Sequence, residues 1–218
     1  MASSSLWKLR RLGARSASVF DRHKEIASVG AYADSLVPRT QGYLAAYDAT
    51  TRYTATWRRE MAEGKTACAA LLGSINEWKP HLGRENPSFN LSDIGDRPTV
   101  PEDLIEDAER LRDAIGQVRR ADGTTPDWVA GALTTLSAQI EAADKETGEA
   151  AMADSEFNRL SREMNHAATE LDGELQRFRR TLGATLGRNH PDFQKLRAER
   201  ASAPDSDDEG GPPPPAPT

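Results

Sequence analysis

Glu163 and His166 are the residues of this chain whose spacing most directly suggests metal chemistry. A Glu-x-x-His pair on a helix places both side chains on one face, as in di-iron four-helix proteins, where a second copy and two further glutamates complete the site. This sequence holds a single copy, and the other histidines, His23, His81 and His190, lack a similarly spaced acid. We therefore expect no metal site and no cofactor.

Sequence patterns typical of catalysis are also missing. The chain contains no His-Glu-x-x-His, Gly-x-x-x-x-Gly-Lys-Ser/Thr, Gly-x-Gly-x-x-Gly or Gly-x-Ser-x-Gly pattern. Catalysis needs polar groups that converge in a concave site, whereas a thin helical bundle spreads such groups along solvated faces. We therefore predict that the protein is not an enzyme, has no catalytic residues and takes no small-molecule substrate.

Basic side chains concentrate near both ends of the sequence. In a helical hairpin these ends would form one basic pole, opposite an acidic pole made by residues 102–109. A basic pole suits lipid headgroups, nucleic acid or an acidic protein surface. The alternatives are a solvated face, or a pole neutralised by the chain's own acidic tail. The candidate contacts with an anionic surface are Lys8, Arg10, Arg11, Arg15, Arg177, Arg179, Arg180, Arg188, Lys195 and Arg197.

Residues 1–20 are interpreted as a basic amphipathic N-terminal segment. Leu6, Trp7 and Leu9 gather loosely on one side of the predicted helix, and lysine and arginine occupy the others. Such a helix can insert its apolar face into an anionic membrane. The alternatives are an ordinary helix start or a cleaved targeting segment, because the composition is rich in serine and arginine and lacks acids before Asp21.

The longest pattern in the sequence runs from Leu12 to Leu82. Apolar and small residues recur there in alternating steps of three and four, which is typical of a helix that packs along another helix. Pro38 interrupts this run and would normally break a helix. Because the pattern keeps its phase across it, we predict one helix over 12–82 with a kink near Pro38.

The remaining segments predict further helices over 101–121, 126–187 and 191–200. Residues 80–100 predict a loop whose Phe89, Leu91 and Ile94 pack back against the helices. A break near Gly148 is an alternative, but a lone glycine costs only about 1 kcal/mol in a helix, so we favour a continuous one. The acidic and proline-rich segment 201–218 predicts a disordered tail.

Composition agrees with a thin bundle. Hydrophobic residues make up 37% and charged residues 28% of the 218 residues, with a net charge of -6. This is too little apolar material for a thick globular core, but enough for narrow buried stripes. The single cysteine, Cys68, falls on such a stripe and is interpreted as a small buried hydrophobe, with a reactive thiol as the alternative.

These elements predict an all-α fold: an elongated antiparallel helical hairpin or three-helix bundle over 12–200 with coiled-coil-like heptad seams. No family motif identifies it. In layout, however, a long kinked helix, further antiparallel helices and the basic N-terminus resemble a BAR domain, the dimeric, membrane-curving coiled coil. That resemblance implies a homodimer that senses membrane curvature, and it assigns no site residues.

We therefore expect a non-enzymatic structural or adaptor protein that acts through helix–helix contacts with a protein partner or a second copy of itself. The first alternative is a peripheral, BAR-like membrane-binding dimer that uses the basic N-terminal helix. The second is nucleic-acid binding through the basic pole. The expected location is the cytoplasm, with peripheral membrane association under the first alternative.

Overall fold

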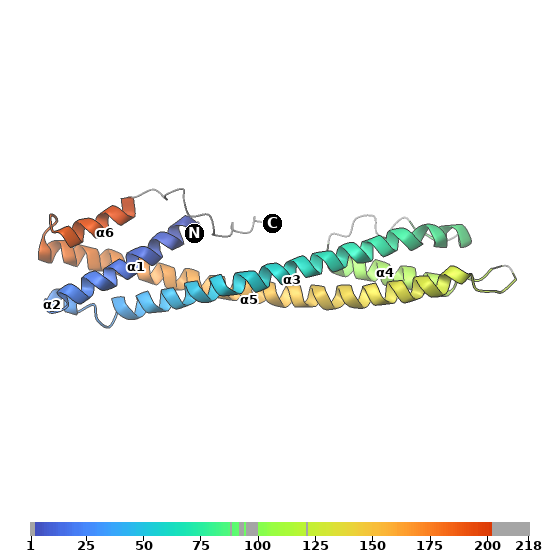
Figure 1. Cartoon of the computed structure of the whole chain (residues 1–218), viewed down its shortest axis with the longest axis horizontal. Helices are drawn as coiled ribbons and strands as arrows, with labels where there is room; N and C mark the ends of the chain where they lie inside the picture. Colours follow the sequence, from blue (N-terminus) through green and yellow to red (C-terminus); the bar gives the residue numbers. More distant parts are fainter. Residues whose placement is uncertain (1–2, 88, 92–93, 95–99, 121, 202–218) are drawn as a thin grey trace. The chain divides into compact units, whose positions relative to one another are not determined.

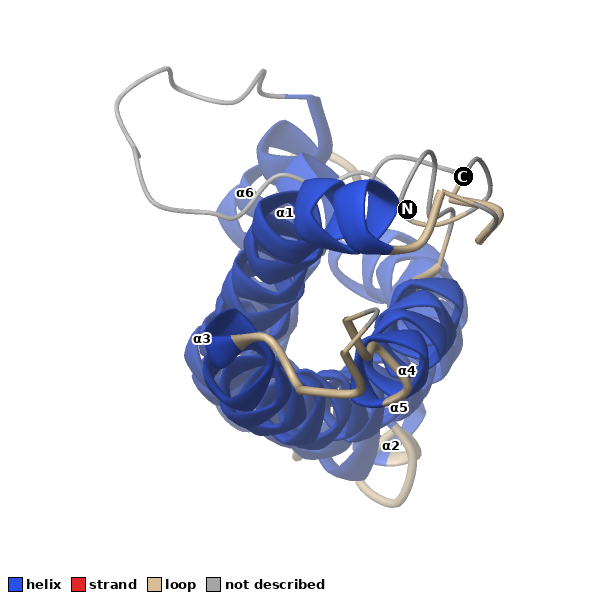
Figure 2. Ribbon diagram, turned by 90° about the vertical axis from the view of Figure 1, so that its right-hand side faces the viewer, coloured by secondary structure: helices blue, strands red, loops and turns tan. Residues whose placement is uncertain are grey.

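The computed structural model describes residues 3–87, 89–91, 94, 100–120 and 122–201. Every regular element in these ranges is a helix and none is a strand, which confirms the all-α class (Figures 1 and 2). The predicted tail lies outside the described residues, except for Ala201. The helices are α1 (Ser3–His23), α2 (Ala27–Gly30), α3 (Leu36–Glu85), α4 (Pro101–Gly116), α5 (Asp127–Leu186) and α6 (Pro191–Ala201).

The chain divides into two compact units. Unit 1 comprises residues 1–52 and 158–218, and unit 2 comprises residues 53–157. Both long helices, α3 and α5, contribute to each unit.

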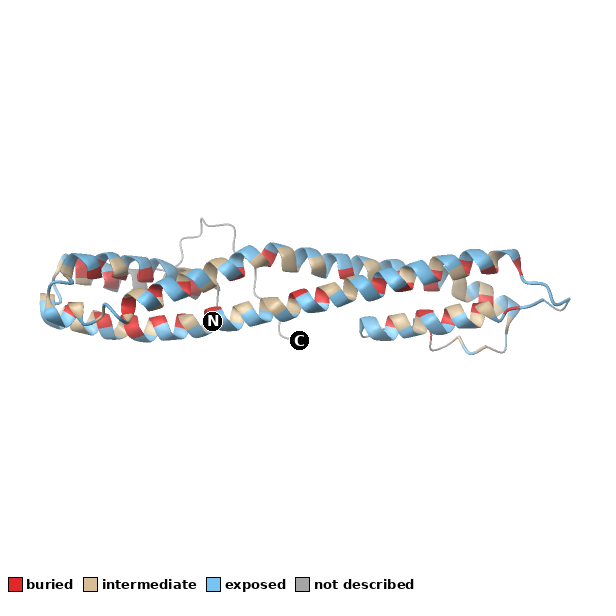
Figure 3. Ribbon diagram, turned by 90° about the horizontal axis from the view of Figure 1, so that it is seen from below, coloured by how far each residue is buried: buried red, intermediate tan, exposed pale blue. Residues whose placement is uncertain are grey.

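Unit 1 packs α1, α2 and α6 around the first part of α3 and the last part of α5. The α3 and α5 segments run antiparallel, since Arg39 bonds Glu174 and Thr50 bonds the carbonyl of Leu160. Buried residues recur along these helices, as the red segments of Figure 3 show. The largest fully buried side chains of this unit are Leu36, Tyr43, Leu171, Leu175 and Phe178.

Unit 2 packs α4 against the remaining parts of α3 and α5. Its core is aliphatic, and leucine and isoleucine of all three helices meet there: Leu71, Ile75, Leu111, Ile115 and Leu136. Away from α4, the two long helices contact each other directly. There Trp57 stacks on Phe157 with ring centroids 4.6 Å apart and donates its Nε1–H to Asp154 at 3.0 Å.

The prediction of one kinked helix from Leu12 to Leu82 is wrong. The chain leaves the helix after His23, makes the short α2 and re-enters a helix at Leu36. Gly30 permits this turn, because a Cβ atom there would lie 2.6 Å from the carbonyl oxygen of Lys24. Pro38 occupies the first turn of α3, where its missing N–H has no helical partner to lose.

Helix α3 continues past Pro80 to Glu85, further than the predicted end of the helix. Pro80 is exposed, whereas Leu82 is completely buried, so packing of the last turn holds the helix together. As predicted, described residues of the following segment pack back against the helices: Ile94 is buried in the core of unit 2, and Leu91 packs near Gly83. The Lys79 ammonium donates to the carbonyl of Ile94 at 2.6 Å.

Helix α5 passes through Gly148 without interruption, so the break considered there does not occur. A Cβ atom at Gly148 would meet no other atom within 4 Å. This glycine therefore faces open space and carries no packing role. Helix α4 ends at Gly116, before the predicted end at residue 121, although Val118 beyond it is still buried.

Candidate functional site

A basic pocket in unit 1 is the candidate site, and two glycines shape its walls. Gly187 adopts a left-handed conformation with φ of 86°, which ends α5 and turns the chain toward α6. Gly183 lets the next helix approach closely, because a Cβ atom there would lie 2.7 Å from Cε2 of Phe193. The end of α5 and the start of α6 are thereby held side by side.

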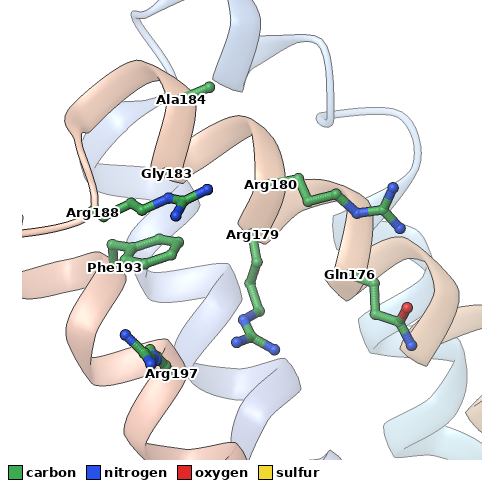
Figure 4. Close-up of a pocket in the computed structure, with 8 residues that line it drawn as sticks. All are labelled: Gln176, Arg179, Arg180, Gly183, Ala184, Arg188, Phe193 and Arg197. Carbon is green, nitrogen blue, oxygen red and sulfur yellow. The ribbon is translucent and has the colours of Figure 1, made fainter.

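The cavity between α5 and α6 has a volume of about 540 Å³ (Figure 4). Phe193 lies between Arg188 and Arg197 in this view, and the other two arginines project from α5. None of the lining residues that the structure describes is acidic, so a positive potential is expected inside the cavity. The lining residues are Gln176, Arg179, Arg180, Gly183, Ala184, Arg188, Phe193 and Arg197.

Two buried carboxylates of unit 1, those of Glu174 and Asp192, pair with residues that do not line this pocket. Glu174 accepts hydrogen bonds from Ser35 and Arg39, and Arg177 lies 3.4 Å from it. Asp192 forms an ion pair with Arg22 at 3.0 Å. In the part of the chain that the structure describes, neither carboxylate pairs with Arg180, Arg188 or Arg197.

A second, smaller cavity of about 310 Å³ lies between α1 and α6. Phe193 and Arg197 of α6 line the first cavity, whereas Lys195 and Leu196 line the second, so α6 has a basic pocket on each flank. The residues that line this second cavity are Arg15, Ser18, Val19, Arg22, Lys195 and Leu196.

The predicted anionic-surface residues thus separate into two groups. Those lining the pockets are Arg15, Arg179, Arg180, Arg188, Lys195 and Arg197.

Four residues of the predicted set line neither pocket: Lys8, Arg10, Arg11 and Arg177. Arg10 is 3.7 Å from Asp48 and lies over the Tyr47 ring, and Arg11 lies over the Trp7 ring. Arg177 points toward Glu174, as described above, and Lys8 is half-buried.

The residues predicted to insert into a membrane are largely taken up by the fold. Leu6 and Leu9 are only 9% and 7% exposed, and both belong to the core of unit 1. Tyr43 donates its hydroxyl to the carbonyl of Leu6, which ties α1 to α3. Trp7 is half-buried. In this conformation the two leucines are not available for insertion, since the apolar face of α1 packs into the core of unit 1.

The structure brings together three side chains that sequence reasoning left apart. His23, His190 and Asp192 each offer one ligand atom, and these atoms lie within 4.8 Å of one another. A hydrogen bond from His23 lowers the pKa of the Asp192 carboxyl, and the nearby Arg22 charge adds to the effect. No local spacing announces this cluster, because His23 is 167 residues away from His190 and meets it only through the fold.

The Glu163–His166 pair, in contrast, lies on the surface. The side chains of His166 and its neighbour Glu170 are 78% and 49% exposed, and Glu163 pairs with Arg159.

Cys68 is half-buried beside the core of unit 2, and burial raises the pKa of its thiol. The acidic residues 102–109 belong to α4 of unit 2.

Comparison with protein-family models, with curated proteins and with solved structures found no match to this chain. Among the helices that the structure describes, none has both the length and the hydropathy that a membrane span requires.

Proposed function

We propose that this chain is a non-enzymatic adaptor protein that binds a phosphate-bearing partner in the α5–α6 pocket of unit 1. One observation carries the proposal: among the residues whose side chains the structure describes, four arginines and no acidic residue line a single concave pocket. The planar guanidinium fork matches the oxygen geometry of phosphate and binds it through paired, charge-assisted hydrogen bonds.

The charge balance around the pocket supports this proposal. Within the described part of the chain, the guanidinium groups of Arg180, Arg188 and Arg197 have no acidic partner. Bringing like charges into one cavity is unfavourable unless an anion joins them. A bound phosphate would supply that anion, so the site gains stability from its ligand.

The chemistry of the lining favours binding over catalysis. Arginine stays protonated at physiological pH and neither takes up nor releases a proton there. Glutamine and phenylalanine, the other large lining residues, do not titrate either. A pocket of this composition can hold and orient a phosphate group, which is the property that an adaptor needs.

Single-stranded nucleic acid is the second candidate partner, and Phe193 is the observation that favours it. The ring is half-buried and lies between two arginines in the pocket (Figure 4). Stacking of a base on an aromatic ring contributes about 1–3 kcal/mol, and neighbouring arginines would hold the backbone. Under this alternative, a base stacks on Phe193 and the arginines bind the phosphates of the backbone.

A peripheral membrane role has weaker support, because Leu6 and Leu9 are buried in the fold.

We also propose, as part of the adaptor hypothesis, that the chain is an elongated helical hairpin with heptad-like seams that self-associates. Small-angle scattering in solution tests this part, because it gives both mass and maximum dimension. A compact monomeric particle would contradict it.

The pocket hypothesis is tested with a triple variant, Arg180→Gln, Arg188→Gln and Arg197→Gln. The matched control is Arg52→Gln, Arg58→Gln and Arg162→Gln, which changes the net charge equally at exposed arginines outside the pocket. Binding is measured for tripolyphosphate, a single-stranded oligonucleotide and vesicles with phosphorylated lipid headgroups. Circular dichroism verifies that both variants stay folded.

We expect the pocket variant to lose at least about tenfold in affinity, and its logarithmic salt dependence for the oligonucleotide to fall by about 2. The control should retain wild-type affinity. Binding of all three probes points to phosphate as the recognised group, and binding of the oligonucleotide alone to the second candidate. Equal losses in both variants would show that net charge, and not the pocket, binds the anion.

A further inference from the structure

The cluster of His23, His190 and Asp192 joins two helices that are far apart in the sequence. His23 ends α1, His190 lies in the turn after α5, and Asp192 is the second residue of α6. Nε2 of His23 donates to Oδ2 of Asp192 at 2.9 Å. The two imidazole rings meet edge to face, with centroids 5.5 Å apart.

Two imidazoles and a carboxylate are a ligand set that suits Zn²⁺. Zinc binds each such atom at about 2.0–2.2 Å, so ligand atoms around one ion lie roughly 3–3.5 Å apart. The ligand atoms of this cluster already lie within 4.8 Å of one another. Small side-chain rotations are therefore enough to close the cluster around an ion.

Arg22 provides the outer support that a carboxylate ligand needs. Its guanidinium lies 3.0 Å from Oδ1 of Asp192, while Oδ2 faces His23. Outer contacts of this kind fix the orientation of a metal ligand. The Arg22 side chain is 51% exposed, so water screens much of its repulsion toward a bound cation.

We propose that His23, His190 and Asp192 form a Zn²⁺ site that fastens the end of α1 to the start of α6. The ion takes the place of the proton on Nε2 of His23: a neutral imidazole binds it as the tautomer protonated at Nδ1, and an imidazolium first releases one proton to solvent. A water molecule completes the coordination, since the cluster supplies three protein ligands.

His190 must give up one contact to bind the ion. Its Nδ1 accepts the backbone N–H of Asp192 at 3.2 Å. That N–H belongs to the first turn of α6, where the helix itself supplies no acceptor. The site does not depend on the phosphate pocket, because none of its three ligands lines that cavity.

The four histidines of the chain provide matched variants for the test. The full chain, without a histidine tag and stripped with a chelator, is titrated with Zn²⁺ against a chromophoric competitor. Thermal unfolding with and without Zn²⁺ is recorded in parallel, and Co²⁺ replaces Zn²⁺ to report coordination by absorption. The site variants are His23→Ala and His190→Ala, and the controls are His81→Ala and His166→Ala.

We expect one Zn²⁺ per chain, a higher Tm with zinc and a visible Co²⁺ band. Each site variant should lower zinc affinity by more than about 100-fold, since even outer-shell changes lower affinity 10- to 100-fold. It should also abolish the zinc-dependent rise in Tm and the Co²⁺ absorption band. The controls should bind as wild type does. His190→Ala keeps the His23–Asp192 pair, so it separates loss of the metal from loss of the fold. Stoichiometric binding that survives this variant, or no binding by the wild-type chain, would overturn the proposal.

Discussion

Arg39 donates a hydrogen bond of 2.7 Å to Glu174, whose carboxylate is only 5% exposed. The two residues join the start of α3 to α5 within unit 1. Ser35 donates to the same carboxylate. The buried Glu174 carboxylate is thus held by Arg39 of α3 and by Ser35 in the turn just before it.

Replacing Arg39 by methionine should destabilise the protein by about 1–3 kcal/mol, because it leaves the Glu174 carboxylate buried without its main counter-charge. The loss is expected below the upper end for buried pairs, since the Arg39 side chain is 37% exposed. Urea unfolding followed by circular dichroism measures it. Arg177→Met is the control: this side chain is 68% exposed and 3.4 Å away, so the loss should be under about 1 kcal/mol. If Arg39→Met and Arg177→Met lowered the free energy of unfolding equally, Arg39 would not be the main counter-charge of Glu174.

Gly64 and Gly148 should respond in opposite ways to the same substitution. A Cβ atom at Gly64 would lie 3.2 Å from both the Cβ of Ala150 and the carbonyl oxygen of Glu146. Gly64→Val should therefore force α3 and α5 apart in unit 2 and cost about 1–3 kcal/mol. Gly148→Val should be close to neutral, and Gly148→Ala should stabilise by about 0.5–1 kcal/mol, because open space surrounds that position. Thermal unfolding compares the variants, and a neutral Gly64→Val would refute the close approach.

Cys68 should be a slow nucleophile. Burial raises the pKa of its thiol, and nearby Glu102 contributes in the same direction. A raised pKa leaves less thiolate at a given pH below it, and the thiolate is the reactive form. Alkylation by iodoacetamide at pH 8 should therefore be slower in the folded chain than in urea. The folded rate should keep rising at pH values where the unfolded rate has levelled off. Identical pH profiles would indicate an exposed thiol.

Leu9→Ala should destabilise unit 1 by about 2–4 kcal/mol, because it removes a side chain from the packed face of α1. Val100→Ala, at a position that is 45% exposed, should change stability by less than about 0.5 kcal/mol. Urea unfolding of both variants makes the comparison. If Leu9→Ala behaves like Val100→Ala, α1 is not docked in solution, and its leucines become available to a membrane.

Periodicity in the sequence predicted the helical class and most of the buried faces, but it missed where the long N-terminal helix ends. Leu12, Val19, Val29 and Leu36 are all buried, although they belong to three different helices. Each helix turns its apolar face to the same core, so the pattern continues through a turn. The decisive feature is local and steric: Gly30 sits against the carbonyl of Lys24.

The basic character of the candidate site could be predicted from the sequence, but the particular residues that line the pocket could not. Charge clustering picked out Arg179, Arg180, Arg188 and Arg197, but it gave no reason to separate them from Arg10. Their convergence depends on the turn at Gly187 and on how α6 then lies against α5. The His23, His190 and Asp192 cluster was missed for a related reason, because tertiary packing alone creates it.

The helices α3 and α5 cross the boundary between the two units without a break, at residues 52–53 and 157–158. No extended linker exists at that boundary for a protease to cut or for a gene fusion to use. Neither unit can be excised without severing two hydrogen-bonded helices in their middle. The chain is therefore a poor source of transplantable modules, and insertions should be tolerated at the exposed residues 122–125 before they are tolerated at the boundary.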